Sequence, residues 1–236
     1  MSTRLEEVVE RVAAVRGRIA AACNEVGRAQ GEVTLTVVTK FFPSSDIRIL
    51  ADLGIRDLGE SRHQEAQVKV AETSDLDLCW HFVGSLQSNK AAAVASYADV
   101  VESVDRAKLV TGLTKGARER GKMIECLVQV SLDPPGGGAV RGRGGAEPAS
   151  VVPLAEEVAA AEGLRLRGVM GVAPEGEDPA PAFDRLVELA EDVRRIDPAA
   201  TWISAGMSGD LEAAIRSGAT HVRIGSAVLG RRPTIK

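Results

Sequence analysis

The chain has 236 residues, of which 44% are hydrophobic, 26% charged and 3% aromatic, and its formal net charge at pH 7 is -4. This composition is typical of a globular protein with an aliphatic core, and the length allows one large α/β domain or two small ones. The acidic balance argues against nucleic acid or an anionic membrane surface as a partner, because both require a basic face.

The first 30 residues predict an additional helix that packs on the rest of the chain. Apolar side chains recur at spacings of three and four within residues 5–28, at Leu5, Val8, Val9, Val12, Val15 and Ile19. This periodicity indicates an amphipathic helix. A charged amphipathic start is unlike a signal peptide or a membrane span, so we expect a cytoplasmic protein.

The cysteines and histidines do not predict a metal site. Cys23, Cys79 and Cys126 are far apart and lie among apolar neighbours, so we interpret them as buried thiols. Neither C-x-x-C nor H-E-x-x-H occurs, and the three histidines are too scattered along the chain to suggest zinc ligands.

Eight apolar runs, each followed by a helical pattern, occupy the remainder of the chain. They cover residues 35–39, 56–60, 79–84, 99–104, 125–132, 166–172, 201–206 and 221–225. Parallel neighbours need crossover helices, so this alternation predicts a (β/α)8 TIM barrel, with residues 1–236 forming a single domain. An open doubly wound sheet is the alternative, but "TKFFPSS" replaces the glycine-rich turn expected after its first strand.

Residues 133–150, "DPPGGGAVRGRGGAEPAS", are rich in glycine and proline and predict a flexible loop after the fifth strand. Arg141 and Arg143 could meet an anion there, although a solvated loop is the simpler interpretation.

Lys40 is the first candidate for chemistry, because it stands where the first apolar run ends. The carboxyl ends of barrel strands carry active sites. A surface lysine capping a strand is one interpretation. The other is an amine held against Phe42 at the barrel mouth, where partial desolvation would make it a Schiff-base nucleophile.

The last two units predict a phosphate site. In "SAGMSGDLEAAI" (204–215), Ser208 or Asp210 could cap a helix, and "VRIGSAVLG" (222–230) places Gly225 and Ser226 at the next helix start. Loops after strands seven and eight form the usual phosphate site of such barrels. Arg223 lies on the same strand face as Gly225, either in a buried ion pair or as a donor to a ligand.

These features together resemble the pyridoxal phosphate homeostasis protein family, whose members have the fold-type III, alanine-racemase-like barrel. The resemblance covers nearly the whole chain, in "VVTKFFP", "LGESRHQE", "WHFVGSLQSNK", "LRGVMGVAP", "SAGMSGDLEAAI" and "VRIGSAVLG". It implies binding of pyridoxal 5'-phosphate (PLP) for storage, buffering or delivery, with apo PLP-dependent enzymes as possible recipients. We expect a monomer or a weak dimer.

The resemblance also implies roles for particular residues. Lys40 would form the internal aldimine with PLP, and Arg223 would face the pyridine nitrogen. The phosphate would be held by Gly206, Met207, Ser208, Gly225 and Ser226, and the pocket would include Ser61, His81, Met170 and Ser204. His81, with Asn89, either lines the site or braces the third strand.

Two positions depart from the family pattern. The usual Gly-Glu-Asn-Tyr after strand two is here Gly-Glu-Ser-Arg, with Ser61 and Arg62 in place of asparagine and tyrosine. A hydrogen bond from the asparagine to the cofactor is therefore lost or replaced by serine through water.

Two other functions stay open at this point. An amino-acid racemase of this barrel type would normally add a second domain and a tyrosine base. Here the last predicted strand lies close to Lys236, and the single tyrosine, Tyr97, precedes the fourth run. A single-base or slow racemase remains possible, as does a barrel that binds another phosphorylated metabolite. The favoured interpretation is a PLP carrier without fast catalysis.

Overall fold

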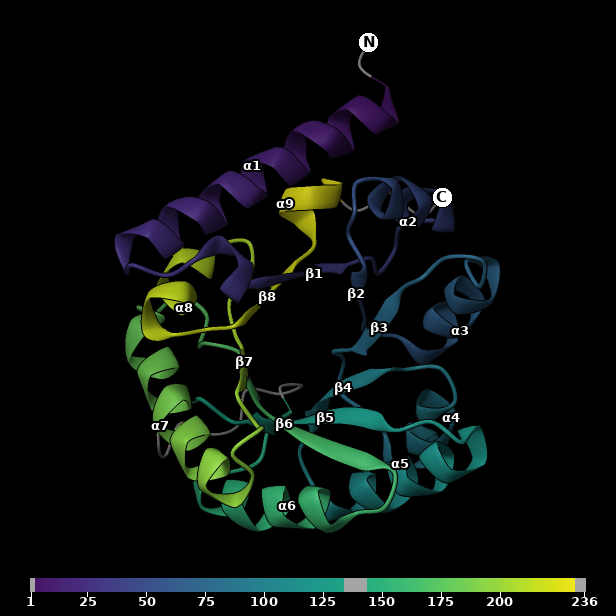
Figure 1. Ribbon diagram of the computed structural model, residues 1–236, viewed down its shortest axis with the longest axis vertical. Coiled ribbons are helices and arrows are strands. Elements are labelled where there is room, and N and C mark those ends of the chain that lie inside the picture. The colour runs from purple at the N-terminus through teal and green to yellow at the C-terminus, as the bar shows by residue number, and fades with distance from the viewer. Residues whose placement is uncertain (1–2, 134–143, 232–236) are drawn as a thin grey trace.

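The computed structural model describes residues 3–133 and 144–231. Eight parallel strands, joined in chain order, close into a barrel (Figure 1). They are β1 (Thr34–Val38), β2 (Asp57–Glu60), β3 (Cys79–Phe82), β4 (Val100–Val104), β5 (Ile124–Val130), β6 (Leu164–Gly171), β7 (Trp202–Ser204) and β8 (His221–Ile224). The predicted TIM barrel is confirmed, and each of the eight apolar runs overlaps a strand.

Closure pairs β1 with β8 and sets Thr36 opposite Arg223. The first and last strands of the sequence are therefore neighbours. Because all the strands are parallel, the segment after β1 that carries Lys40 and the segment after β8 that begins at Gly225 emerge at the same mouth.

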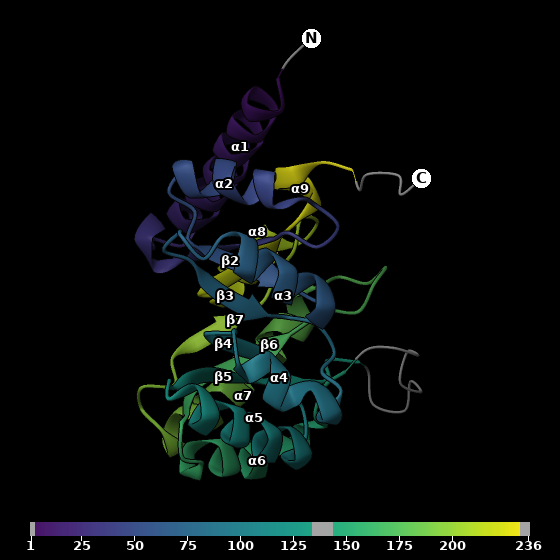
Figure 2. The ribbon, with the colours of Figure 1, turned by 90° about the vertical axis from the view of Figure 1, so that its right-hand side faces the viewer.

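Helices surround the barrel (Figure 1). They are α1 (Arg4–Glu25), α2 (Ser44–Asp52), α3 (His63–Glu72), α4 (Ala91–Ala95), α5 (Ala107–Arg120), α6 (Pro148–Ala160), α7 (Ala180–Ile196), α8 (Leu211–Ser217) and α9 (Ser226–Leu229), with short 3-10 turns at Gln30–Glu32 and Ser88–Lys90. In Figures 1 and 2, α1 and α6 lie at opposite ends of the molecule.

The predicted N-terminal helix is confirmed as α1, which lies across α8 and α9 (Figure 1). It begins with a capping box, in which the Thr3 hydroxyl accepts a hydrogen bond from the Glu6 amide and the Glu6 carboxylate accepts one from the Thr3 amide. Its apolar face joins side chains of β1, β8 and α2 in one buried cluster. The helix ends at Glu25, earlier than predicted, and Gly27 follows in the left-handed conformation with φ of 69°.

The loop predicted over residues 133–150 extends too far toward the C-terminus, because secondary structure is already present before residue 150. Ala146 bridges Val130, and α6 begins at Pro148, because proline suits the first turn of a helix where its missing amide is not needed. Arg141 and Arg143 lie outside the described residues.

The three cysteines are free thiols. Cys23 and Cys126 are buried as expected, whereas Cys79 is half-buried, since it opens β3 at the amino-terminal mouth of the barrel. Within the described ranges, no helix is long and apolar enough to cross a membrane.

Candidate functional site

A cavity of about 480 Å³ opens at the carboxyl ends of the strands. This volume lies within the range of small-molecule and cofactor pockets. Eight of the predicted site residues line it: Lys40, Ser61, Met170, Met207, Ser208, Arg223, Gly225 and Ser226. Residues widely separated in the sequence thus meet at one mouth of the barrel.

Three predicted residues do not line this cavity. Gly206 has φ of 91°, and a Cβ there would lie 2.7 Å from the Ala214 Cβ, so a glycine permits close packing of this loop on α8. His81 and Ser204 are buried deeper in the barrel, at 1% and 0% exposure. His81 contacts Glu102 on β4 and Asp57 on β2 instead of lining the cavity.

Lys40 lies in a turn between Thr39 and Phe41, and hydrogen bonds hold the backbone of both of these neighbours. The Lys69 ammonium donates to the Thr39 carbonyl at 2.7 Å and to the Glu65 carboxylate at 2.6 Å. The same Glu65 carboxylate accepts the Phe41 amide at 2.5 Å. Phe41 is the one described residue other than glycine with positive φ, at 72°, and such a conformation persists when its surroundings hold it.

Lys69 is itself buried, at 4% exposure, and it also pairs with Glu60 at 2.6 Å. The Thr39 hydroxyl donates to the same Glu60 oxygen at 2.6 Å. We call Thr39, Glu60, Glu65 and Lys69 the lysine-turn cluster. It fixes the backbone before and after Lys40, so the turn is set by buried ionic contacts rather than by local sequence alone.

The two predicted phosphate loops come together. The Ser208 and Ser226 hydroxyl oxygens lie 3.4 Å apart, and the Ala227 amide donates to Ser208 at 3.3 Å. Gly225 allows close approach to β1, because a Cβ there would lie 3.2 Å from the Val38 carbonyl oxygen. Two hydroxyl groups therefore share one corner of the cavity that Lys40 also lines.

The expected role of Asp210 as a side-chain cap of α8 is wrong. Its carboxylate instead accepts the Met207 amide at 2.6 Å, within the loop, and no side-chain bond caps α8. The Met207 amide is consequently occupied, which leaves the serine hydroxyls as the more available donors at this corner.

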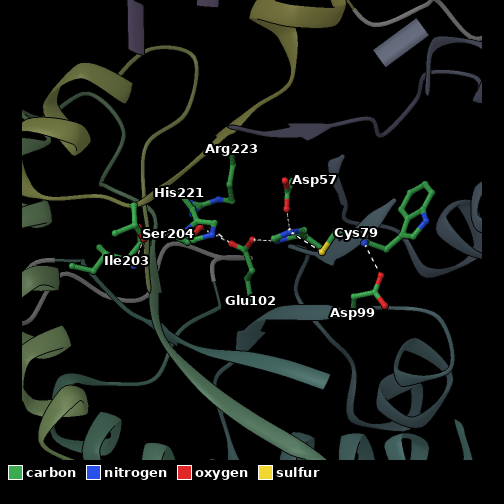
Figure 3. A network of polar contacts seen from close by, with 11 residues as sticks. Asp57, Cys79, Asp99, Glu102, Ile203, Ser204, His221 and Arg223 are labelled. Carbon is green, nitrogen blue, oxygen red and sulfur yellow. Dashed lines mark hydrogen bonds and ion pairs between the residues drawn. The ribbon is translucent and has the colours of Figure 1, made fainter. Parts of the chain in front are cut away.

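Arg223 on β8 lines the cavity. Figure 3 shows it near Ser204 and Glu102 in a network of polar contacts. Its guanidinium donates to the Ser204 hydroxyl at 2.6 Å and to the Gly171 carbonyl at 2.9 Å. Ser204 in turn donates to Glu102 at 2.6 Å, and Glu102 lies 3.8 Å from Arg223. Arg223 thus takes part in a buried ion pair with Glu102 and also lines the cavity. The two roles predicted for it, ion pairing and donation to a ligand, therefore do not exclude each other.

Glu102 is the centre of this buried network. Burial alone would raise its pKa, but the hydrogen bond from His81 at 2.8 Å and the charges of His81 and Arg223 lower the pKa to about 2. Burial lowers the pKa of Arg223 and the Glu102 charge opposes that shift. The network keeps a carboxylate and a guanidinium paired inside the barrel.

Ser61 and Arg62 occupy the positions that depart from the family pattern. Ser61 lines the cavity, and Gly84 permits this, since a Cβ there would lie 2.3 Å from the Ser61 carbonyl oxygen. The Arg62 guanidinium lies 4.5 Å from the centre of the Phe41 ring, in a cation-π contact next to Lys40.

Sequence reasoning missed several polar residues that line the cavity, namely Ser85, Gln129, Ser131 and Asp133. Gln129 on β5 lines it, and its Oε1 is buried without a hydrogen-bond partner among the described residues, while its amide nitrogen donates to Gly144. A lone glutamine in an apolar strand is the signal that could have found it, because such a side chain faces the interior of a barrel.

Tyr97 is not among the residues that line the cavity. It lies after α4, stacked on His63 with ring centres 5.8 Å apart. Burial raises its pKa above the ordinary value. The described structure therefore places no tyrosine where a racemase base would be required.

Comparisons with known proteins identify the family of this chain. The chain matches the family described as "Alanine racemase, N-terminal domain" over residues 16–233. It is 42% identical to the pyridoxal phosphate homeostasis protein of Mycobacterium tuberculosis strain H37Rv, over 97% of this chain and 94% of that one. It is 34% identical to the protein of the same name from Escherichia coli K12, over 97% and 98%.

Among solved structures, PipY of Synechococcus elongatus PCC7942 with PLP bound is 32% identical, with a TM-score of 0.81 over 94% of this chain and all of PipY. An alanine racemase from Clostridium difficile 630 shares the fold at 14% identity, with a TM-score of 0.66 over 97% of this chain and 57% of that one. The chain belongs to the alanine racemase N-terminal domain family and, within it, to the pyridoxal phosphate homeostasis proteins.

Proposed function

We propose that this protein holds PLP on Lys40 as a Schiff base and serves PLP homeostasis by storing, buffering or delivering the cofactor, without fast catalysis. The observation that carries this proposal is one cavity lined by a lysine, two facing serine hydroxyls and a buried arginine. The names of the curated relatives and the PLP bound to PipY support it.

The residues present fit the chemistry of PLP. The facing Ser208 and Ser226 hydroxyls would bind the phosphate, and the Lys40 amine would attach to the aldehyde carbon. The unpartnered Gln129 Oε1 offers an acceptor for a donor on the ligand. Bound PLP supplies an electron-withdrawing ring, and the residues around it decide how strongly that ring acts.

Arg223 is the residue that argues against fast turnover. We place it beside the pyridine nitrogen, where a fixed guanidinium disfavours protonation of that nitrogen. The ring would then withdraw electrons weakly. With Tyr97 remote from the cavity as well, a two-base racemase lacks support, and the chain would act as one PLP-binding domain.

The three cysteines are free thiols, which is usual for proteins of the cytoplasm, and we propose that the protein acts there. We expect a monomer or weak dimer there, with apo PLP-dependent enzymes as recipients.

Delivery and racemisation are distinguished by one pair of assays on the PLP-loaded protein. Mixed with a purified apo PLP-dependent enzyme, the loaded protein should restore that enzyme's activity, whereas protein reduced with borohydride should not. Chiral analysis after incubation with L-alanine and other amino acids should show no turnover at ordinary enzymatic rates. Rapid racemisation would refute the carrier function.

A further inference from the structure

The amino-terminal mouth of the barrel, opposite the cofactor cavity, carries a second group of side chains with ligand chemistry. Asp57 opens β2 and Cys79 opens β3, and the two are direct neighbours in the β2 to β3 register. His81 lies two residues after Cys79, so it shares the same face of the strand. All three side chains are therefore directed to one place, although Asp57 is distant from the other two in sequence.

The distances among the three groups are those of metal ligands. The His81 Nε2 lies 3.1 Å from the Asp57 carboxylate oxygen and 3.6 Å from the Cys79 sulfur, and all three atoms lie within 4.8 Å of one another. In a tetrahedral zinc site with bonds of about 2.0 to 2.3 Å, neighbouring nitrogen and oxygen ligands are about 3.3 Å apart, and neighbouring nitrogen and sulfur ligands about 3.6 Å. Binding would therefore require little movement of the side chains, and Zn²⁺ would displace the Nε2 proton of His81 and the thiol proton of Cys79, which pass to solvent.

A buried carboxylate already orients the histidine. The His81 Nδ1 donates to Glu102 at 2.8 Å, and both residues are 1% exposed. Histidines that bind metal usually donate their other ring nitrogen to a carboxylate or carbonyl, which fixes the tautomer and the ring. This contact aims the Nε2 at Asp57 and Cys79, and Ser204 and Arg223 hold Glu102 in turn.

The position is also accessible. Asp57 and Cys79 are half-buried, and Cys79 lines a cavity of about 430 Å³ at this mouth, together with the carboxylates of Asp77, Asp99 and Glu125. Arg56 and Lys122 line the same cavity, and Lys122 pairs with Asp99. An ion could therefore enter from solvent and keep a water molecule as its fourth ligand.

We propose that Asp57, Cys79 and His81 form a zinc site at the amino-terminal mouth of the barrel, with water in the fourth position. One thiolate, one imidazole and one carboxylate are the ligand types that favour Zn²⁺ over Mg²⁺ or Ca²⁺, which prefer oxygen alone. The site is distinct from the cofactor cavity and does not depend on the proposed function.

The test uses the tag-free full-length protein, stripped with a chelator and then titrated with Zn²⁺ against a chromogenic chelator, and separately with Co²⁺. We expect one equivalent of Zn²⁺ to bind at micromolar concentration or tighter, and Co²⁺ to produce a thiolate-to-metal charge-transfer band. Cys79→Ser and Asp57→Asn should each weaken Zn²⁺ binding at least about tenfold and Cys79→Ser should abolish the Co²⁺ band. Cys23→Ala, which removes a buried thiol on α1, is the matched control and should bind as the unchanged protein does.

Thermal unfolding of the metal-free proteins checks that each variant folds, and Zn²⁺ should raise the melting temperature of the unchanged protein but not of Cys79→Ser. Failure of the unchanged protein to bind Zn²⁺ would overturn the proposal, because the three groups would then only hydrogen-bond to one another. Equal Zn²⁺ binding by the unchanged protein and Cys79→Ser would also overturn it. Loading with PLP is measured separately, so neither result bears on the carrier function.

Discussion

Lys40 follows β1 and lines the cavity, and it is the residue on which we propose that PLP binds covalently. Lys40→Ala should abolish covalent PLP binding, because no other amine is expected at the aldehyde. It should change the free energy of unfolding by about 1 kcal/mol or less, since a side chain at a barrel mouth adds little to the core.

The visible absorption of the loaded protein and its urea unfolding curve measure the two effects of Lys40→Ala. Lys108→Ala, an exposed lysine on α5, is the control and should leave both unchanged. If Lys40→Ala unfolded the protein, the placement of Lys40 at the mouth would be wrong.

His221 predicts a dependence of stability on pH. Burial lowers its pKa from an ordinary value of 6.5 to about 4, against the opposing charge of Glu102. Between these values the unfolded chain binds more protons than the folded one, so the stabilisation is complete above pH 6.5 and is lost as the pH falls toward 4. The shift corresponds to about 3 kcal/mol.

Urea unfolding of the metal-free protein at several pH values, with His221→Asn as the comparison, measures this effect. The difference in unfolding free energy between the two proteins should change by about 3 kcal/mol from pH 7.5 to pH 4. A difference that stays constant with pH would show that His221 does not carry the effect.

At the scale of elements, the turn after β1 depends on α3, which supplies Glu65 and Lys69 of the lysine-turn cluster. Lys69→Met removes the ammonium that binds the Thr39 carbonyl and leaves the Glu60 carboxylate buried without its partner. Breaking a buried ion pair costs about 3 to 5 kcal/mol. Burial already raises the pKa of Glu60 despite Lys69, so uptake of a proton by Glu60 should reduce this cost.

A double-mutant cycle with Glu60→Gln measures the coupling by urea unfolding. Lys69→Met together with Glu60→Gln should be less destabilised than the sum of the two single variants. Lys69→Met should also slow the loading of PLP, because the turn around Lys40 loses its anchor. Arg118→Ala, at the exposed pair of Arg118 with Glu162, is the control and should cost less than about 1 kcal/mol. Additive costs in the cycle would contradict the role of the cluster.

The helix α1 is the second element whose contribution can be measured, because its two faces differ. Ile19 is 5% exposed and packs in the cluster shared with β1 and β8, whereas Val9 on the same helix is 41% exposed. Ile19→Ala should cost about 2 to 5 kcal/mol, and Val9→Ala within about 0.5 kcal/mol. Equal costs, measured by urea unfolding, would show that α1 does not pack as described.

For the molecule as a whole, the barrel could be predicted from the sequence because eight apolar runs alternate with helical patterns and parallel strands need such crossovers. Closure of the barrel, which pairs β1 with β8, then explains why Lys40 and Arg223 share a cavity although they lie near opposite ends of the sequence. The two serine loops were predicted because small residues follow the last strands in both.

Contacts between strands or across the turn could not be predicted from one chain. Glu102 contacts His81 and Ser204 from different strands, and no spacing in the sequence relates them. Asp57 and Cys79 meet only through the β2 to β3 register. The spacing of four between Glu65 and Lys69 predicts a surface pair on a helix, and only the fold reveals that Lys69 is buried and that both side chains contact the turn around Lys40.

The most direct test of the central claim is the location of the cofactor. The purified protein is incubated with PLP, reduced with borohydride, digested and mapped by mass spectrometry. We predict that the added mass lies on the peptide that contains Lys40 and is absent without reduction. An unmodified protein, or a modification on another lysine with Lys40 untouched, would contradict the account.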